Sequence, residues 1–173
     1  MNLPRPCTKR RIILTFGILC VLAGCGSSSR VARSATEMDC MARAMYFESN
    51  RSSRDGMIAV GSVVMNRVQS DDFPDTICGV VSQRNQFAPG VMTREMNGRS
   101  APLARAASRA VYRGERHPDI ASARFFHAAW YQPSYDNMHY VLTTGGNAFY
   151  EKRQPEDVTA PAPPSAIEGR TER

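Results

Sequence analysis

The strongest hydrophobic pattern lies between residues 54 and 68, where DGMIAVGSVVMNRV places apolar side chains on every side of a helix from Met57 to Met65. A helix that is apolar all round is normally buried inside a domain. The segment is shorter than the roughly 20 residues that a membrane-spanning helix requires. The pattern therefore predicts a central core helix.

A helix is also predicted from about Thr36 to Ser49, after a flexible linker over residues 26–34. Ser34 and Glu37 are three residues apart, which is the spacing of a capping box at a helix N-terminus. The segment NRSSRDG then separates this helix from the core helix.

Glu48 has an unexpected place on this first helix. At about 100° per residue, Asp39 and Arg43 form the polar side, whereas Glu48 points almost the same way as Met41 and lies four residues after Ala44. Glu48 is therefore expected along the apolar side, close to the end of the helix.

A carboxyl group in apolar surroundings prefers its neutral form, so its pKa rises. A proton held near neutral pH is what a general acid needs, and glycoside cleavage commonly calls for one. The alternative is an ordinary last-turn salt bridge with Arg51 or Arg54. Helix geometry taken alone favours the salt bridge.

Two further helices are predicted after the core helix. A short one over residues 76–83 begins near Thr76, and another over residues 101–114 has Pro102 in its first turn and Gly114 at its end.

A short β element is predicted towards the C-terminus. Residues 123–131, ARFFHAAWY, are aromatic-rich and suit a strand, and YVLT and AFYE flank a turn at Thr144–Asn147 as in a hairpin. Residues 152–173 are Pro-rich and polar, which favours a disordered tail. The expected fold class is α+β, with one mainly helical domain over residues 35–151.

Residues 1–24 have the features of an export signal. Four basic residues precede the apolar run IILTFGILCVLAG, and the following LAGC resembles the lipobox of bacterial lipoproteins. That resemblance implies cleavage before Cys25, which would carry the lipid, with residues 25–34 as tether. An ordinary signal peptide cut near Ala23 and an uncleaved anchor are the alternatives.

The proposed cleavage changes how the net charge is interpreted. The whole chain has 22 basic and 16 acidic residues, a formal charge of +6. Removing residues 1–24 leaves 18 basic and 16 acidic residues. The mature chain has no strong basic excess, and nucleic-acid binding loses its main support.

The cysteine count follows the same cut. Of the five cysteines, Cys7 and Cys20 leave with the signal and Cys25 takes the lipid, so Cys40 and Cys78 remain. In an exported chain such a pair favours a disulfide, and two buried free thiols are the alternative. Two cysteines without suitably spaced histidines do not complete a tetrahedral metal site, so no metal or other cofactor is expected.

Several blocks together resemble a known family. ARAMYFESN, DGMIAVGSVVMNRV, FPDTICGVV and NQF follow in order from Cys40 to Phe87, and this stretch resembles the SleB-type cell wall hydrolases known from spore-cortex-lytic enzymes. A weaker echo in FFHAAW and GGNAFY extends the resemblance over most of residues 38–151.

The resemblance implies a lysozyme-like α+β domain that acts on peptidoglycan. The essential acid of the family is the Glu of a Y-x-E motif, which here is Tyr46-Phe47-Glu48. Members are lytic transglycosylases or muramidase-like hydrolases. In the transglycosylase route one Glu is acid and then base, so no second carboxylate is required. A two-carboxylate enzyme is the less favoured alternative.

The chain departs from the family pattern in two places. Many members continue after QF with a Ser-Trp/Phe-x-Cys-Asp-Gly-like stretch, where this chain has APGVMTREMNG. Many also carry a Gly-x-His-x-Phe-Tyr pattern, and Asn147 stands at the position of that His. These departures concern the substrate cleft and leave Glu48 in place.

Five residues are candidates for binding substrate. Gln86 can bond sugar hydroxyls or N-acetyl groups and Phe87 can stack on a sugar ring, although a loop Gln and a core Phe explain them equally well. Asn66 shares a helix stripe with Ser62, and His127 and Tyr131 lie in an aromatic segment. Structural roles compete with each.

The sequence thus predicts an enzyme that cleaves glycan strands between N-acetylmuramic acid and N-acetylglucosamine, with Glu48 as acid and then base. A hydrolytic muramidase and an inactive peptidoglycan-binding lipoprotein are the alternatives. The expected partners are peptidoglycan and, through Cys25, a membrane facing the wall. In a diderm cell that is the outer membrane, on its periplasmic side.

Overall fold

The computed structural model describes residues 26–49 and 53–171. Within them lie four α-helices, three β-strands and one turn of 3-10 helix. They are α1 (Gly26–Glu48), α2 (Arg54–Val68), α3 (Ile77–Val81), α4 (Ala101–Tyr112), β1 (Phe125–Ala128), β2 (Met138–Thr144), β3 (Asn147–Lys152) and η1 (Pro155–Asp157). The prediction of a mainly helical α+β domain with a hairpin near its C-terminal end is confirmed.

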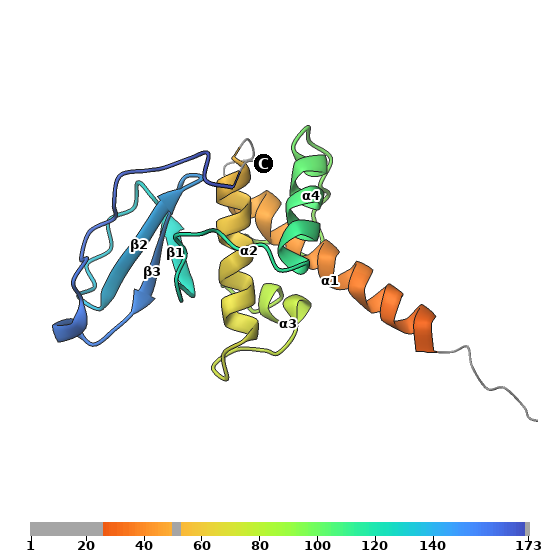
Figure 1. Ribbon diagram of the computed structural model, residues 1–173, viewed down its shortest axis with the longest axis horizontal. Coiled ribbons are helices and arrows are strands. Elements are labelled where there is room, and N and C mark those ends of the chain that lie inside the picture. Colours follow the sequence, from red (N-terminus) through yellow and green to blue (C-terminus); the bar gives the residue numbers. More distant parts are fainter. Residues whose placement is uncertain (1–25, 50–52, 172–173) are drawn as a thin grey trace, which may run out of the picture.

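Helix α2 is the centre of the fold, as its all-round apolar pattern predicts. It stands between the sheet and the other helices (Figure 1), and most of its residues are buried. The side chain of Ser53 caps its N-terminus by accepting a hydrogen bond from the amide of Gly56 at 2.9 Å. At Gly61, an added Cβ would collide with Met45 of α1 and approach Val111 of α4, so the glycine permits close helix packing.

Helix α1 begins ten residues earlier than predicted, at Gly26 instead of Thr36. The expected linker contains Arg, Val and Ala and no proline, and it continues the helix outward, with the side chains of residues 30–33 exposed. The predicted capping box is therefore wrong. Ser34 lies inside the helix, and Glu37 instead accepts a hydrogen bond from the amide of Cys78 at 3.0 Å.

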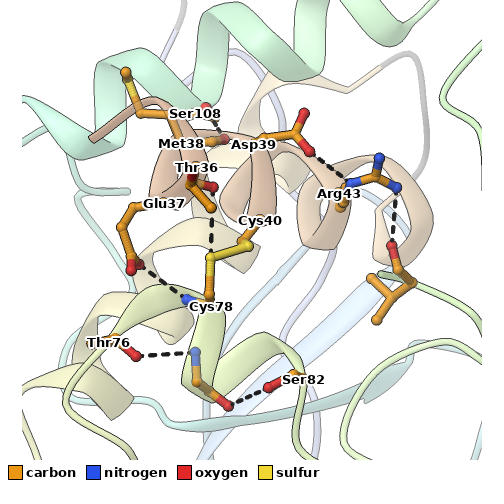
Figure 2. The surroundings of a disulfide bond; sticks show 12 residues. Thr36, Glu37, Met38, Asp39, Cys40, Arg43, Thr76, Cys78, Ser82 and Ser108 are labelled. Atoms are coloured by element: carbon orange, nitrogen blue, oxygen red, sulfur yellow. Dashed lines mark hydrogen bonds and ion pairs between the residues drawn. A yellow bond between two sulfur atoms is a disulfide. The ribbon is translucent and has the colours of Figure 1, made fainter. Parts of the chain in front are cut away.

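Cys40 and Cys78 form a disulfide that joins α1 to α3, as predicted. Figure 2 shows the bond beside Glu37 and Thr76. Thr76 caps α3 by accepting a hydrogen bond from the amide of Gly79 at 3.1 Å. The helix that carries Glu48 is thus linked covalently to the segment after the core helix.

The strands form one antiparallel sheet in the order β1-β3-β2. The hairpin between β2 and β3 is confirmed, and its turn consists of Gly145 and Gly146, both with positive φ. The turn packs on the start of α2: a Cβ built on Gly56 would lie 2.5 Å from the Cα of Gly145. Two glycines therefore allow the hairpin to touch the core helix.

The prediction of a disordered tail is wrong as far as Thr171, the last residue described. The segment runs along the edge of β2, where the amide of Tyr140 donates to the carbonyl of Ala160 and that of Ile167 to the carbonyl of Thr143, both at 2.9 Å. Composition misled here because polar contacts, instead of buried apolar side chains, hold the segment.

Asp55, at the start of α2, anchors the end of this segment. Its carboxylate is 1% exposed and accepts hydrogen bonds from the amides of Arg170 and Thr171 at 2.7 and 2.8 Å, and from the Thr171 hydroxyl. Glu168 adds bonds from the Gly145 amide at 2.7 Å and the Ser53 hydroxyl at 2.5 Å. The segment therefore ends at the contact between hairpin and core helix.

Candidate active site

Glu48 is the last residue of α1, and its side chain is half-buried. One carboxylate oxygen, Oε1, accepts a hydrogen bond from the amide of Ala88. Arg54, one of the two salt-bridge partners considered, pairs instead with Glu115 at 2.8 Å. The other, Arg51, lies outside the described residues. The carboxyl group is thus held by a backbone amide of the loop after α3.

The pKa of Glu48 is raised above its ordinary value. Burial is the largest cause, because it disfavours the charged carboxylate. The hydrogen bond from Ala88 and the positive charge of Arg67 oppose the increase without cancelling it. The balance suits a group that must hold a proton and then release it.

Asn147 fixes the end of the helix that carries the acid. Its side-chain amide donates to the main-chain carbonyl of Glu48 at 2.7 Å. The last carbonyls of a helix have no partner inside the helix, so this bond satisfies one of them. Asn147 starts β3 directly after the Gly145–Gly146 turn, and the hairpin thereby positions the acid.

Arg67 is a residue of the site that sequence analysis missed. It lies in α2, is 3% exposed, and its Nε donates to the carbonyl of Arg124 at 2.7 Å. Burial lowers its pKa to about 10, against the influence of Tyr150 and Glu48. The available signal was an arginine close to the C-terminal end of a mostly apolar helix.

An open cavity of about 450 Å³ lies beside the acid's hydrogen-bond partner. Ala88 belongs both to its lining and to the hydrogen bond with Glu48. The lining comes from the end of α3 and the loop after it, residues 81–93 except Gln86. Three other cavities are lined by residues that do not bond Glu48.

The structure separates Gln86 from Phe87. Gln86 is exposed in the loop, whereas Phe87 is buried in the core, where its ring faces Phe126 at 6.3 Å and the Arg67 guanidinium at 5.4 Å. Phe87 is therefore placed to support the loop that bonds Glu48. Phe87 also belongs to the lining of the open cavity, so its proposed stacking on sugar stays a prediction.

Asn66 has a structural role in the fold. Its side-chain amide donates to the carbonyls of Ala121 and Ala123 at 3.1 and 2.9 Å. Ser62, on the same stripe of α2, accepts from the amide of His117 at 3.0 Å. Both side chains tie the loop before β1 to the core helix, and neither is bonded to Glu48.

His127 and Tyr131 belong to an aromatic cluster on the sheet, which we define as His127, Tyr131, Tyr140 and Tyr150. The His127 Nε2 lies 2.8 Å from the Tyr140 hydroxyl, and its ring contacts Tyr131 and Tyr150. Tyr131 is 49% exposed and neighbours Trp130, which is 82% exposed. The cluster interacts with Arg67 through Tyr150: burial raises the pKa of Tyr150, and the positive charge of Arg67 opposes that increase.

Two further features concern other classes of site. Within residues 26–49 and 53–171, no group of three or more His, Cys, Asp or Glu side chains is arranged to hold a metal. No helix in the same ranges combines the length and hydrophobicity of a membrane span. Cys25, the predicted lipidation site, lies outside the described residues.

Comparison with known proteins identifies the family. The sequence pattern of the family described as Cell Wall Hydrolase matches residues 51–150, more than half of the 173-residue chain. The match begins three residues after Glu48. Spore cortex-lytic enzymes of Oceanobacillus iheyensis and Bacillus cereus are 37% and 39% identical over 54 residues, 31% of this chain. The chain spans about a fifth of the length of these relatives, 20% and 21%.

Two solved structures share the fold. The catalytic domain of the germination-specific lytic transglycosylase SleB from Bacillus anthracis is 24% identical, with a TM-score of 0.56 over 66% of this chain and 93% of that one. The Bacillus cereus SleB catalytic domain is 24% identical, with a TM-score of 0.58 over 68% and 91%. Sequence and fold agree, and this chain belongs to the cell wall hydrolase family.

Proposed function

We propose that this protein cleaves the glycan strands of peptidoglycan between N-acetylmuramic acid and N-acetylglucosamine, with Glu48 as its acid and base. The observation that carries the proposal is the half-buried Glu48 carboxyl, whose pKa is raised and whose Oε1 accepts the Ala88 amide hydrogen bond. The family membership and the SleB-like fold support the choice of substrate class.

In the first step the neutral Glu48 carboxyl gives its proton to the glycosidic oxygen. The bond between C1 of the muramic residue and that oxygen breaks, and the departing sugar leaves as a neutral alcohol. Glu48 is now a carboxylate, and the Ala88 amide and the Arg67 charge stabilise it in that form.

In the second step the 6-hydroxyl of the same muramic residue attacks its own C1. Glu48 takes the hydroxyl proton, and the product is a 1,6-anhydro sugar formed without water. One carboxyl group completes this cycle. Burial is the main cause of the raised pKa of Glu48, and the Ala88 amide and the Arg67 guanidinium are placed to stabilise its carboxylate, which suits an acid that works alone.

The same acid also suits a hydrolytic muramidase, in which water attacks C1. Digestion of purified sacculi followed by mass spectrometry distinguishes the two routes. We expect anhydro-muropeptides as the main products. Mainly reducing ends would replace the transglycosylase route with hydrolysis.

The replacement of the family His by Asn147 motivates a different candidate, an inactive lipoprotein that only binds peptidoglycan. Glu48→Gln separates the two, because it removes the transferable proton and changes the side chain very little. We expect this variant to bind sacculi without solubilising them. Glu156→Gln, in an exposed turn, is the matched control and should clear sacculi like the unaltered protein. If the unaltered protein binds sacculi without clearing them, binding is its function.

We also propose that Cys25 carries a lipid that holds the domain at a membrane facing the wall, the periplasmic side of the outer membrane in a diderm cell. The support is the LAGC sequence at the end of the apolar run. Metabolic labelling with a fatty-acid analogue tests this proposal. Label should enter the protein and be lost in Cys25→Ser.

A further inference from the structure

Resting on the proposed function of Glu48, we propose that Arg67 is a positioning residue, whose buried guanidinium holds the Ala88 loop against Glu48 and stabilises the carboxylate that proton transfer creates. No direct contact with the sugar is required of it. The arginine acts through Glu48, from a buried position in α2 that contacts the loop after α3 and the first strand of the sheet.

The geometry of Arg67 is fixed by aromatic rings. Its Cζ lies 5.1 Å from the ring centroid of Phe73, 5.4 Å from Phe87 and 5.8 Å from Phe125. A guanidinium within about 6 Å of an aromatic ring is attracted to the ring face. Phe87 directly precedes Ala88, whose amide bonds Glu48, so the arginine supports the acid's partner loop.

The charge of Arg67 is unusually costly for the fold. Its Nη1 is buried and has no hydrogen-bond partner among the described residues. A buried, incompletely bonded charge destabilises a domain, and an apolar side chain of similar length would fill the space at lower cost. Stability alone therefore does not account for an arginine here.

The charge of Arg67 also acts on the Glu48 carboxyl group. The positive charge lowers the pKa of Glu48, although burial is the larger influence and keeps the net shift upward. The effect is reciprocal, since Glu48 raises the pKa of Arg67. Tyr150, from β3, is the other group whose titration Arg67 influences. Two further cations face the same rings from outside: Arg124 lies 6.0 Å from Phe73 and Lys152 lies 4.5 Å from Phe125.

This arrangement answers two opposing demands on Glu48. Burial keeps the proton on the acid before the reaction, and the arginine favours its release at the moment of transfer. Afterwards the same charge stabilises the carboxylate until it accepts the second proton. Without Arg67 the acid would hold its proton too tightly.

Arg67→Gln, Arg67→Lys and the control Arg109→Gln test the proposal through the pH dependence of sacculus solubilisation. Glu48 is active while protonated, so the rate falls as pH rises through its pKa. Without the arginine charge the pKa increases, and in Arg67→Gln this decline should move to higher pH. The turnover rate at neutral pH should fall on the order of tenfold, less than the 10²- to 10⁴-fold attributed to proton transfer itself.

Arg67→Lys keeps the charge and should leave the decline close to that of the unaltered protein. Arg109→Gln removes an exposed cation of α4 and should change neither rate nor profile. Circular dichroism and thermal unfolding establish that each variant is folded. An Arg67→Gln profile that coincides with that of the unaltered protein, or an Arg67→Lys profile displaced as far as Arg67→Gln, would overturn the proposal.

A titration without substrate separates this inference from the proposed function. Carbon-13 NMR of the Glu48 carboxyl measures its pKa directly, even if the protein proves to clear no sacculi. Arg67→Gln should raise that pKa and Arg67→Lys should not. If Arg67→Gln does not fold, Arg67→Met takes its place under the same expectations. Arg67→Gln and Arg67→Met could both fail to fold while Arg67→Lys folds. In that case a raised Glu48 pKa in Arg67→Lys would also count against the proposal.

Discussion

The side-chain amide of Asn147 donates a hydrogen bond to the main-chain carbonyl of Glu48 at 2.7 Å. The residue that departs from the family pattern is therefore bonded to the residue that carries the proposed chemistry. The bond joins the first residue of β3 to the last residue of α1. It connects the sheet to the acid without using the acid's carboxyl group.

Asn147→Ala should lower both stability and activity. The carbonyl of Glu48 would lose its partner in a largely buried position, at a cost of about 1–3 kcal/mol. Urea unfolding measures the stability and sacculus clearing the activity, with Asn97→Ala in an exposed loop as control. Asn147→His would restore a ring N–H donor, and we expect it to clear sacculi better than the Ala variant. If Asn147→Ala clears sacculi as fast as the unaltered protein, this hydrogen bond has no role in positioning Glu48.

The pH dependence of the reaction should follow the raised pKa of Glu48. Because the neutral form donates the proton, activity should be retained above the ordinary pKa of a glutamate, 4.5, and fall only as pH passes the raised value. Rates of sacculus clearing at constant ionic strength measure this decline. A decline centred on the value of an exposed glutamate would show that burial does not control the acid.

Breaking the Cys40–Cys78 disulfide should destabilise the domain by about 4 kcal/mol, since the bond closes a long loop in the unfolded chain. Urea unfolding with and without reductant measures the difference. A double variant, Cys40→Ala with Cys78→Ala, should have the lower stability and be indifferent to reductant. Free-thiol labelling of both cysteines in protein from an oxidising compartment would contradict the pairing.

The anchor of the C-terminal segment should weaken in acid. Burial alone would raise the pKa of Asp55, but the hydrogen bonds from Thr171 and Arg170 outweigh it and hold the pKa below its ordinary value. A lowered pKa adds stability that is complete above the unfolded-state value near 4 and is lost as pH falls through the folded-state value.

Asp55→Asn removes this contribution, and we expect a loss of about 2 kcal/mol at pH 7 and faster proteolysis within residues 153–171. The difference from the unaltered protein should shrink at low pH, where Asp55 is itself neutral. Asp71→Asn, on an exposed loop, is the control. Equal stability of the Asn variant at pH 7 would show that the anchor adds nothing.

The parts of the fold that sequence predicted are those set by neighbouring residues. The core helix follows from the continuous apolar pattern around Val60, and the hairpin from two glycines between alternating strands. Glu48 stood out because its helix is short of polar positions. Each of these signals is complete within about fifteen residues, so no knowledge of the tertiary structure is needed.

The parts that sequence missed depend on contacts between distant segments. Arg67 is held by three aromatic rings from separate segments of the chain. Asn66 donates hydrogen bonds to a loop more than fifty residues away. The ordered segment ending at Thr171 depends on Asp55, 116 residues earlier. Composition predicted disorder there because it does not show that the buried Asp55 carboxylate binds the end of the segment.

The contact between Gly56 and Gly145 has a consequence for recognising distant members of this family. Main chain meets main chain there, and any side chain at either position would force the hairpin away from the core helix. Both positions should therefore remain glycine during evolution. A glycine eight residues after the acid, paired with a glycine two residues before the Asn147 position, offers a search signature for genomes in which the surrounding motifs have drifted.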